Sequence, residues 1–234
     1  MENLQIMEQE NTVLRWGALA GLLGGMFFIL TFIVTIAGPV GTEDPVNLAG
    51  WVTRFPDIKA ARIVENVIYL MALMLEVPLF LALYYALQRT RLAPALFGSV
   101  LGIMGLAAMM FSSVPHVAHA PLSDIYHTPG VSPADQATIA ILWKGIWGVI
   151  DVQTYIGFFV VSAALIVLGV GMITSPDFGK GIGGAALLLG CAGLVMAVLQ
   201  IVDPASLIGA GSYFASIIFY FIVGWQLFIL SRVS

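Results

Sequence analysis

Six long runs of apolar residues divide this chain, and they constrain its fold more than any other feature. The runs cover residues 15–38, 60–88, 92–114, 138–172, 181–202 and 208–231. A helix needs about 20 residues to cross a hydrocarbon core of roughly 30 Å, so each run is long enough. The sequence therefore predicts an all-α polytopic membrane protein with six transmembrane helices. These form a single domain over residues 15–231, behind a tail over residues 1–14.

Composition narrows the possible functions. Hydrophobic residues make up 60% of the chain and charged residues only 9%, which lies outside the range of soluble domains. The net charge of −4 provides no basic surface, so nucleic-acid binding is excluded and the lipid bilayer is the expected partner. The single cysteine, Cys191, lies in an apolar run and cannot form an internal disulfide.

Basic residues predict the orientation in the membrane. The short connection "QRTRLAP" between the second and third runs is purely basic, whereas the connection over residues 115–137 contains no Lys or Arg. Positive residues favour the cytoplasmic side. We therefore expect both termini in the cytoplasm of a cell-membrane protein, with outer loops over residues 39–59 and 115–137.

The first, third and fifth runs share a spacing. Each extends 24 residues from a basic anchor to a proline: Arg15 to Pro39, Arg91 to Pro115 and Lys180 to Pro204. This rhythm predicts three αα-hairpin repeats. The alternative is that any span between an anchor and a helix-ending proline has about this length.

Small residues recur along the same three runs. They are Gly17, Gly21 and Gly25 in the first, Gly98, Gly102 and Gly105 in the third, and Gly190 and Gly193 in the fifth. Such spacing lets helix backbones approach closely in lipid. We expect these faces to be helix contacts, and they are also the candidate surface for a homodimer.

The two outer loops contain apolar residues of their own. Asp44 and Pro45 predict the start of a short helix, with Trp51, Val52 and Phe55 lying on the membrane surface or forming a lid over the outer face. Ser132 and Pro133 predict the start of the fourth helix in the same way. That helix is too long for one perpendicular crossing, so we place its first turns, with Trp143 and Trp147, at the interface.

Charged and polar residues interrupt the second run, where they are costly. At 100° per residue they lie within about 100° of one another, which predicts one stripe facing the bundle interior. The stripe consists of Arg62, Glu65, Asn66, Tyr69 and Glu76. Arg62 and Glu65 are positioned to neutralise each other, which makes a purely structural ion pair the alternative explanation. Glu76 has no such neighbour, and we expect it to keep its proton and to serve as a proton carrier or cation ligand.

The fourth run offers a second polar face. Lys144, Gly148, Asp151 and Tyr155 follow one another at helical spacing in "KGIWGVIDVQTY". Asp151 lies roughly 10 Å from Lys144 along the helix, too far for direct pairing. Arg62 is the candidate partner if the two helices touch; otherwise Asp151 faces water in a cavity.

Most of these polar residues belong to the outer halves of their helices. His116, His119, Gln200, Asp203 and Tyr213 lie at the same expected depth as the charged residues of the second and fourth runs. We infer a polar pocket that opens to the extracytoplasmic side. Its expected binding residues are Arg62, Glu65, Asn66, Tyr69, Glu76, Lys144, Asp151 and Tyr155.

All three histidines, His116, His119 and His127, follow the third run. Val114 precedes a proline, a step that disfavours helical geometry, so we expect the helix to end there. The histidines would then leave on an extended or 3₁₀ segment near the pocket mouth.

These histidines are candidate metal ligands. With Asp124, Glu65 or Asp151 they could complete a site for zinc or another transition metal. The spacing H-x-x-H lacks the glutamate of the H-E-x-x-H motif, however, and polar interfacial histidines are the default interpretation. We therefore expect no cofactor, with a metal as the alternative.

Several stretches resemble an uncharacterised family of small prokaryotic integral membrane proteins, defined only as a domain of unknown function. They are "GALAGLLGGMFFIL", "LALYYALQRTRLAPALFGSVLGIMGLA" and "VLGVGMITSPDFGKGIGGAALLLGCAGLV". The resemblance covers residues 14–231 and rests on hydropathy and the rhythm of small residues. It implies a six-helix fold and a prokaryotic membrane, and it implies no functional residues.

Three functions fit these features. The first is binding or transport of a small solute or ion through the outward pocket, with Glu65, Glu76 and Asp151 as the charged groups and Arg62 as fixed counter-charge. The second is an accessory or assembly subunit in which every charge is structural. The third is a membrane metalloenzyme that uses the histidines, although no Ser-His-Asp, Cys-His or phosphate-loop pattern is present.

Overall fold

The chain folds into long helices. The structure, a computed structural model, describes residues 2–36, 48–203, 208 and 211–233. These residues form α1 (Glu2–Ile36), α2 (Leu48–Leu87), α3 (Leu92–Tyr126), α4 (Pro133–Ile173), α5 (Gly179–Val202) and α6 (Gly211–Val233). Each of these six helices is long and apolar enough to cross a membrane. The prediction of an all-α, six-helix, multi-pass membrane protein is confirmed.

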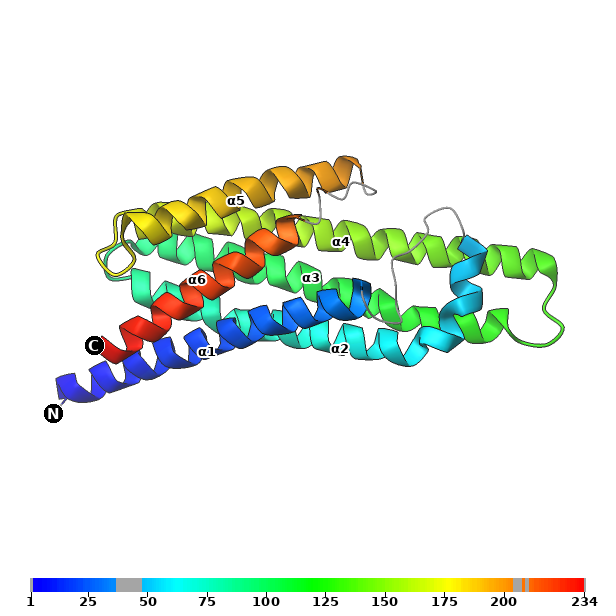
Figure 1. Ribbon diagram of the computed structural model, residues 1–234, viewed down its shortest axis with the longest axis horizontal. Coiled ribbons are helices and arrows are strands. Elements are labelled where there is room, and N and C mark those ends of the chain that lie inside the picture. The colour runs from blue at the N-terminus through cyan, green and yellow to red at the C-terminus, as the bar shows by residue number, and fades with distance from the viewer. Residues whose placement is uncertain (1, 37–47, 204–207, 209–210, 234) are drawn as a thin grey trace.

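The helices form a closed ring. Each packs against its neighbours in sequence, and α6 closes the ring against α1. Helices α2, α4 and α6 also contact one another across the interior, whereas α1, α3 and α5 do not. Three hairpin repeats would produce this alternation of inner and outer helices, but the repeat itself stays a prediction. Both termini lie at one end of the bundle, which we call the terminal end (Figure 1). The α3–α4 turn lies at the opposite end, which we call the distal end.

Outward-facing side chains are largely apolar. Phe97 is 62% exposed, Val152 54% and Leu188 69%. Contiguous apolar surface of this kind would cause aggregation in water, whereas in a bilayer it is solvated by lipid.

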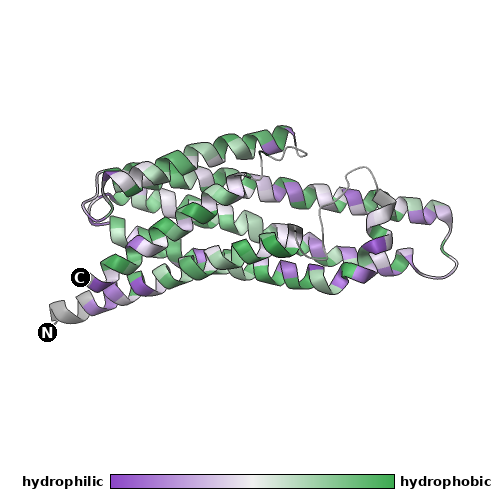
Figure 2. Cartoon of the chain, viewed as in Figure 1, coloured by the Kyte–Doolittle hydropathy of each residue, from purple (hydrophilic) through white to green (hydrophobic). Residues whose placement is uncertain are grey.

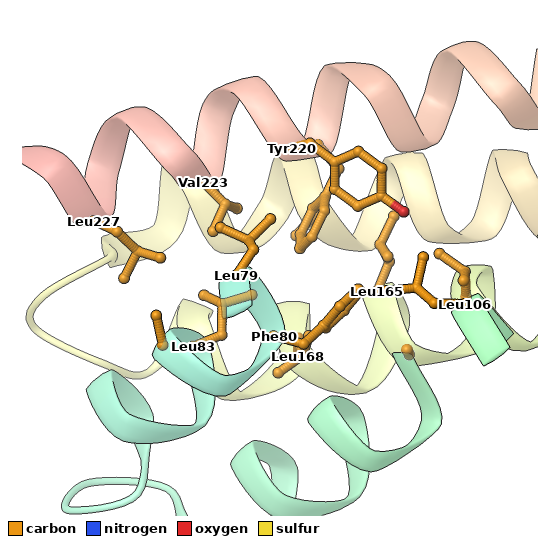
Figure 3. Packing of buried hydrophobic residues seen from close by; sticks show 14 of the residues in the cluster. Leu79, Phe80, Leu83, Leu106, Leu165, Leu168, Tyr220, Val223 and Leu227 are labelled. Carbon is orange, nitrogen blue, oxygen red and sulfur yellow. The ribbon is translucent and has the colours of Figure 1, made fainter. Parts of the chain in front are cut away.

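The main core fills the interior between α2, α3, α4 and α6. Its buried leucines come from all four helices, and Tyr220 and Val223 of α6 pack against them (Figure 3). Leu79 and Leu83 of α2 are fully buried there. The terminal half of the bundle is therefore solidly packed.

Glycines allow the closest helix crossings. A Cβ atom on Gly105 of α3 would lie 2.8 Å from the Gly157 carbonyl oxygen of α4, and one on Gly157 would lie 2.9 Å from the Gly105 carbonyl oxygen. Likewise, a Cβ on Gly17 of α1 would lie 2.8 Å from the Pro78 carbonyl oxygen. The eight glycines singled out in the sequence all face other helices of the same chain. Homodimerisation stays a prediction, and it would have to use other residues.

Helices α2, α3 and α4 are longer than one membrane crossing. With 40, 35 and 41 residues they extend about 50–60 Å, whereas α5 and α6 extend about 35 Å. The surplus lies at the distal end, where polar residues alternate with apolar ones (Figure 2). We call this part the cap, and it consists of residues 50–59, 115–126 and 133–144.

Two expectations about this region are wrong: the end of the third helix, and the extent of the outer loop over residues 115–137. The prediction that the third helix ends at Val114 is wrong, because α3 continues through Pro115 and Pro121 to Tyr126. The preference of a pre-proline residue against helix is overridden here by packing of the continued helix against α4. Helix α4 begins at Pro133, with Ser132 as the predicted N-cap accepting a hydrogen bond from the Asp135 amide at 3.2 Å. Most of the expected outer loop over residues 115–137 is therefore helical.

The cap also has its own small core. Trp51, Val52 and Phe55 of α2 are buried against Trp143 of α4 instead of lying on the membrane surface. In Figure 1 the first turns of α2 cross the axis of the bundle before the helix bends along it. Pro56 lies in this part, and a proline inside a helix removes one hydrogen bond and favours such a bend. The predicted helix start at residues 44–45 lies outside the described residues.

Candidate functional site

A cavity of about 380 Å³ lies within the bundle, and all six helices line it. Thr35 lies in the last turn of α1, Gln200 in the last turn of α5, and Ser212 in the first turn of α6. The cavity is therefore at the depth where these three helices end and the cap begins. Its lining residues are Thr31, Phe32, Thr35, Arg62, Glu65, Asn66, Tyr69, Ser112, His116, Trp147, Ile150, Asp151, Thr154, Tyr155, Phe158, Gln200, Ser212 and Tyr213.

An ion pair occupies one wall of the cavity. Arg62 Nη1 lies 2.9 Å from Glu65 Oε2, and the two side chains are 11% and 12% exposed. Thr35 of α1 donates a hydrogen bond to the other oxygen, Glu65 Oε1. The Arg62 guanidinium carbon also lies 5.1 Å from the centre of the Trp147 ring and 5.9 Å from that of Trp51. Cation–π contacts of this kind connect the wall of the cavity to the cap.

Asp151 is the third charged residue of the lining. It comes from α4, is half-buried, and makes no hydrogen bond or ion pair with any described residue. No ion pair joins it to Arg62. Of the two alternatives raised by the sequence, the structure therefore matches the one in which Asp151 faces a cavity. Lys144 is exposed, lies two turns away, and is not part of the lining.

Two buried polar atoms in the lining lack partners. Asn66 Oδ1 and the Tyr69 hydroxyl are buried, and neither has a hydrogen-bond partner among the described residues. Buried polar atoms are nearly always hydrogen-bonded, by protein, water or ligand. Both side chains line the cavity, but these two atoms are themselves covered, so a ligand would reach them only after neighbouring side chains shift.

Aromatic rings form about half of the remaining wall. Each of the three inner helices contributes one tyrosine, namely Tyr69, Tyr155 and Tyr213. Phe28 of α1 packs against two of them, with ring centres 5.9 Å from Tyr69 and 5.2 Å from Tyr213. Phe158 lies 5.1 Å from Tyr213. This cluster separates the cavity from the solid core of the terminal half.

Glu76 lies beyond this cluster and not in the cavity lining. It is fully buried, and both carboxyl oxygens lack hydrogen-bond partners among the described residues. Its carboxyl group occupies the space left by Gly24 of α1, where an added Cβ would lie 2.9 Å from Glu76 Cδ. Glu76 was expected among the pocket residues because it has the helical phase of the polar stripe. The Glu76 side chain instead lies two turns beyond Tyr69, toward the terminal end.

The histidines occupy three different environments. His116 lines the cavity, and its ring centre lies 5.9 Å from that of His119. His119 is buried, with its ring 4.1 Å from Trp143 at 30° and 5.5 Å from Trp147 at 27°.

His127 lies away from the other two, at the C-terminal cap of α3, where its Nδ1 lies 2.8 Å from the Ser123 carbonyl oxygen. Asp124, a proposed co-ligand, forms an exposed ion pair with Lys59 at 3.5 Å. The described part of the chain contains no cluster of three His, Cys, Asp or Glu side chains suited to a metal ion. The metal site stays a prediction for which the described residues provide no preformed ligand set.

Sequence analysis missed the hydroxyl residues that α1 and α3 contribute to the cavity. Thr31 and Thr35 lie one turn apart in an otherwise apolar run, and Ser112 interrupts the third run. These hydroxyls also bond to the carbonyls of their own helices, as Thr31 does to Phe27 at 3.0 Å. Hydroxyl spacing within an apolar run was therefore the signal that could have identified them.

Comparison of the chain with protein-family models, curated proteins and solved structures found no match. Its function must therefore be argued from the site itself. The polar cavity, the unpartnered Asp151 and the buried Glu76 are the features that such an argument has to explain.

Proposed function

We propose that this membrane protein binds a small solute in the cavity and transports it across the bilayer. The observation that supports the proposal is a cavity of about 380 Å³ that is lined by all six helices and contains three charged side chains. Ligand pockets in proteins measure roughly 300–1,000 Å³, so this volume suits a small molecule. Charged residues inside membrane segments are costly and usually mark a substrate pathway.

An accessory or assembly subunit with purely structural charges is the competing hypothesis. The Arg62–Glu65 pair, taken alone, would fit it, because the two charges neutralise each other. Asp151 favours solute binding instead, since it lines the cavity and makes no hydrogen bond or ion pair with a described residue, and the buried Asn66 Oδ1 also lacks a hydrogen-bond partner among the described residues. A purely structural role would leave the cost of burying these groups without compensation.

Glu76 is proposed as a proton-bearing group that couples transport to proton movement. It is isolated in the interior, two turns from the cavity residue Tyr69, on the route that a solute would take toward the terminal end. A carboxyl group without a counter-charge in such a place is stable only in its neutral form. Gain and loss of that proton would have to accompany any opening of the terminal half.

The basic residues at the terminal end support the proposed orientation in the membrane. Arg89 pairs with Glu10, and Arg91 Nε donates a hydrogen bond to Thr174 Oγ1 at 2.7 Å, so these arginines belong to the ordered turns at that end. The positive-inside rule then assigns the terminal end to the cytoplasm and the cavity to the outer half of the membrane.

Uptake into proteoliposomes tests the proposal. A panel of labelled amines, amino acids, sugars and carboxylates would be offered to vesicles that contain the wild type or a Thr154→Phe variant, in which a ring fills part of the cavity. We expect one solute class to enter with the wild type only, and a Glu76→Gln variant that folds normally to lose uptake. If no class binds or enters, solute transport is refuted and the accessory role gains support. Uptake that is unchanged in the Glu76→Gln variant would remove the proton-coupling role alone.

A further inference from the structure

The charges of the cavity lining determine which ligand charge the cavity prefers. Arg62 and Glu65 pair with each other, which leaves Asp151 as the carboxylate available to a ligand. A carboxylate in a membrane interior is stabilised by a cation and destabilised by an anion. Charge alone therefore selects a cationic ligand.

The aromatic walls provide a second, independent reason to expect an organic cation. Five rings other than Trp147 line the cavity: Phe32, Tyr69, Tyr155, Phe158 and Tyr213. The face of an aromatic ring attracts an organic cation, and the rings also bury the apolar body of a ligand. A hydrated inorganic ion would gain little from such a wall.

The unpartnered atoms are suited to N–H donors. Asn66 Oδ1 is an acceptor, and the Tyr69 oxygen can accept as well. Both side chains line the cavity, and a shift that uncovers either oxygen would add an acceptor on α2 to the Asp151 carboxylate on α4 for the N–H groups of a primary ammonium.

We infer that the cavity takes a small organic monocation, an ammonium group attached to an apolar body. This inference rests on the proposed function and specifies its solute class. Asp151 binds the ammonium group and the aromatic rings enclose the apolar body, while Asn66 and Tyr69 accept further hydrogen bonds once their oxygens are uncovered. The volume of about 380 Å³, near the lower limit for ligand pockets, excludes lipid-sized molecules.

Three probes of one shape and different charge test the inference by isothermal titration calorimetry in detergent. They are 2-phenylethylammonium, the neutral 2-phenylethanol and the anionic phenylacetate. We expect the ammonium to bind the wild type about tenfold or more tightly than the alcohol, because the alcohol donates only one hydrogen bond and lacks the positive charge that attracts Asp151. Phenylacetate should show no binding. An equal or better affinity for the alcohol or for phenylacetate overturns the inference.

Variants at one position separate charge from shape. An Asp151→Asn variant should lose about tenfold or more of the ammonium affinity while its affinity for the alcohol is unchanged, and Asp151→Glu should keep the preference. Val152→Ala, at a lipid-facing neighbour that is 54% exposed, is the matched control and should behave as the wild type. Circular dichroism and size-exclusion chromatography establish that each variant is folded.

The outcomes distinguish this inference from the proposed function. If Thr154→Phe abolishes binding of 2-phenylethylammonium but Asp151→Asn does not, the cavity is a binding site and the assignment of the charge is wrong. If the wild type does not bind the ammonium at all, the inference is overturned, and the panel of other solutes decides separately whether the cavity binds anything.

Discussion

Replacing Glu76 by methionine should make the protein more stable. The carboxyl group is fully buried, and neither oxygen has a hydrogen-bond partner among the described residues. An unsatisfied buried polar atom costs about 1–3 kcal/mol, so two such atoms cost roughly 2–6 kcal/mol. Methionine is also unbranched and of similar length, and a volume-conserving substitution costs less than about 1.5 kcal/mol. The Glu76→Met variant should therefore gain about 1–4 kcal/mol in the free energy of unfolding.

The gain is measured by reversible unfolding of the purified protein in mixed micelles, followed by circular dichroism. Glu76→Gln is the matched control, because it keeps the shape and leaves polar atoms buried, so its stability should stay close to that of the wild type. If Glu76→Met destabilises the protein by more than about 1 kcal/mol, the carboxyl group has a stabilising partner, and its burial is not a cost to stability.

Four further substitutions test the packing and one surface ion pair. Gly157→Ala should destabilise the protein by about 1–3 kcal/mol, because its Cβ would lie 2.9 Å from the Gly105 carbonyl oxygen. Its control is Gly148→Ala, where nothing lies within 4 Å of the added Cβ, and this variant should be neutral or up to about 1 kcal/mol more stable. Equal unfolding free energies of the two variants would contradict this difference. Trp143→Ala should cost about 3–5 kcal/mol and make the cap sensitive to limited proteolysis, since this ring is 4% exposed; an unchanged cleavage pattern would show that the cap does not depend on it. Lys59→Ala should change the unfolding free energy by less than about 1 kcal/mol, because its partner Asp124 is 70% exposed, and a larger loss would mean that this pair is more than a surface contact.

Helical periodicity was sufficient to predict much of the site. The polar stripe of α2 and the polar face of α4 both follow from spacing at 100° per residue, and four of the five stripe residues line the cavity with Asp151 and Tyr155. Periodicity specifies the direction in which a side chain points, and charged side chains in a membrane have few directions open to them. The orientation of α2 and α4 was therefore predictable without knowledge of their neighbours.

The depth of Glu76 in the bundle and the length of α3 were harder to predict. Glu76 has the same helical phase as Tyr69, but aromatic rings fill the interior between α1 and α6. These are the rings of Phe28, Tyr213 and Tyr220, and their positions depend on how the two helices pack. The cap was missed because the rule for the residue before Pro115 is local, whereas the continued helix is stabilised by contacts with α2 and α4. Interactions between distant segments decided both cases, and hydropathy does not report them.

A solute can enter the cavity inside the helix bundle only if the cavity is accessible to water. Cysteine accessibility tests it directly, since Cys191 is the only cysteine and can be replaced by serine. In that background, Thr154→Cys places a thiol in the cavity lining, and Val152→Cys places one on the lipid-facing side about 3 Å away along α4. Membrane vesicles would be treated with a charged, membrane-impermeant thiol reagent. We predict that the Thr154→Cys variant reacts and the Val152→Cys variant does not; equal reactivity of the two, or no reaction at Thr154→Cys, would contradict a water-accessible cavity.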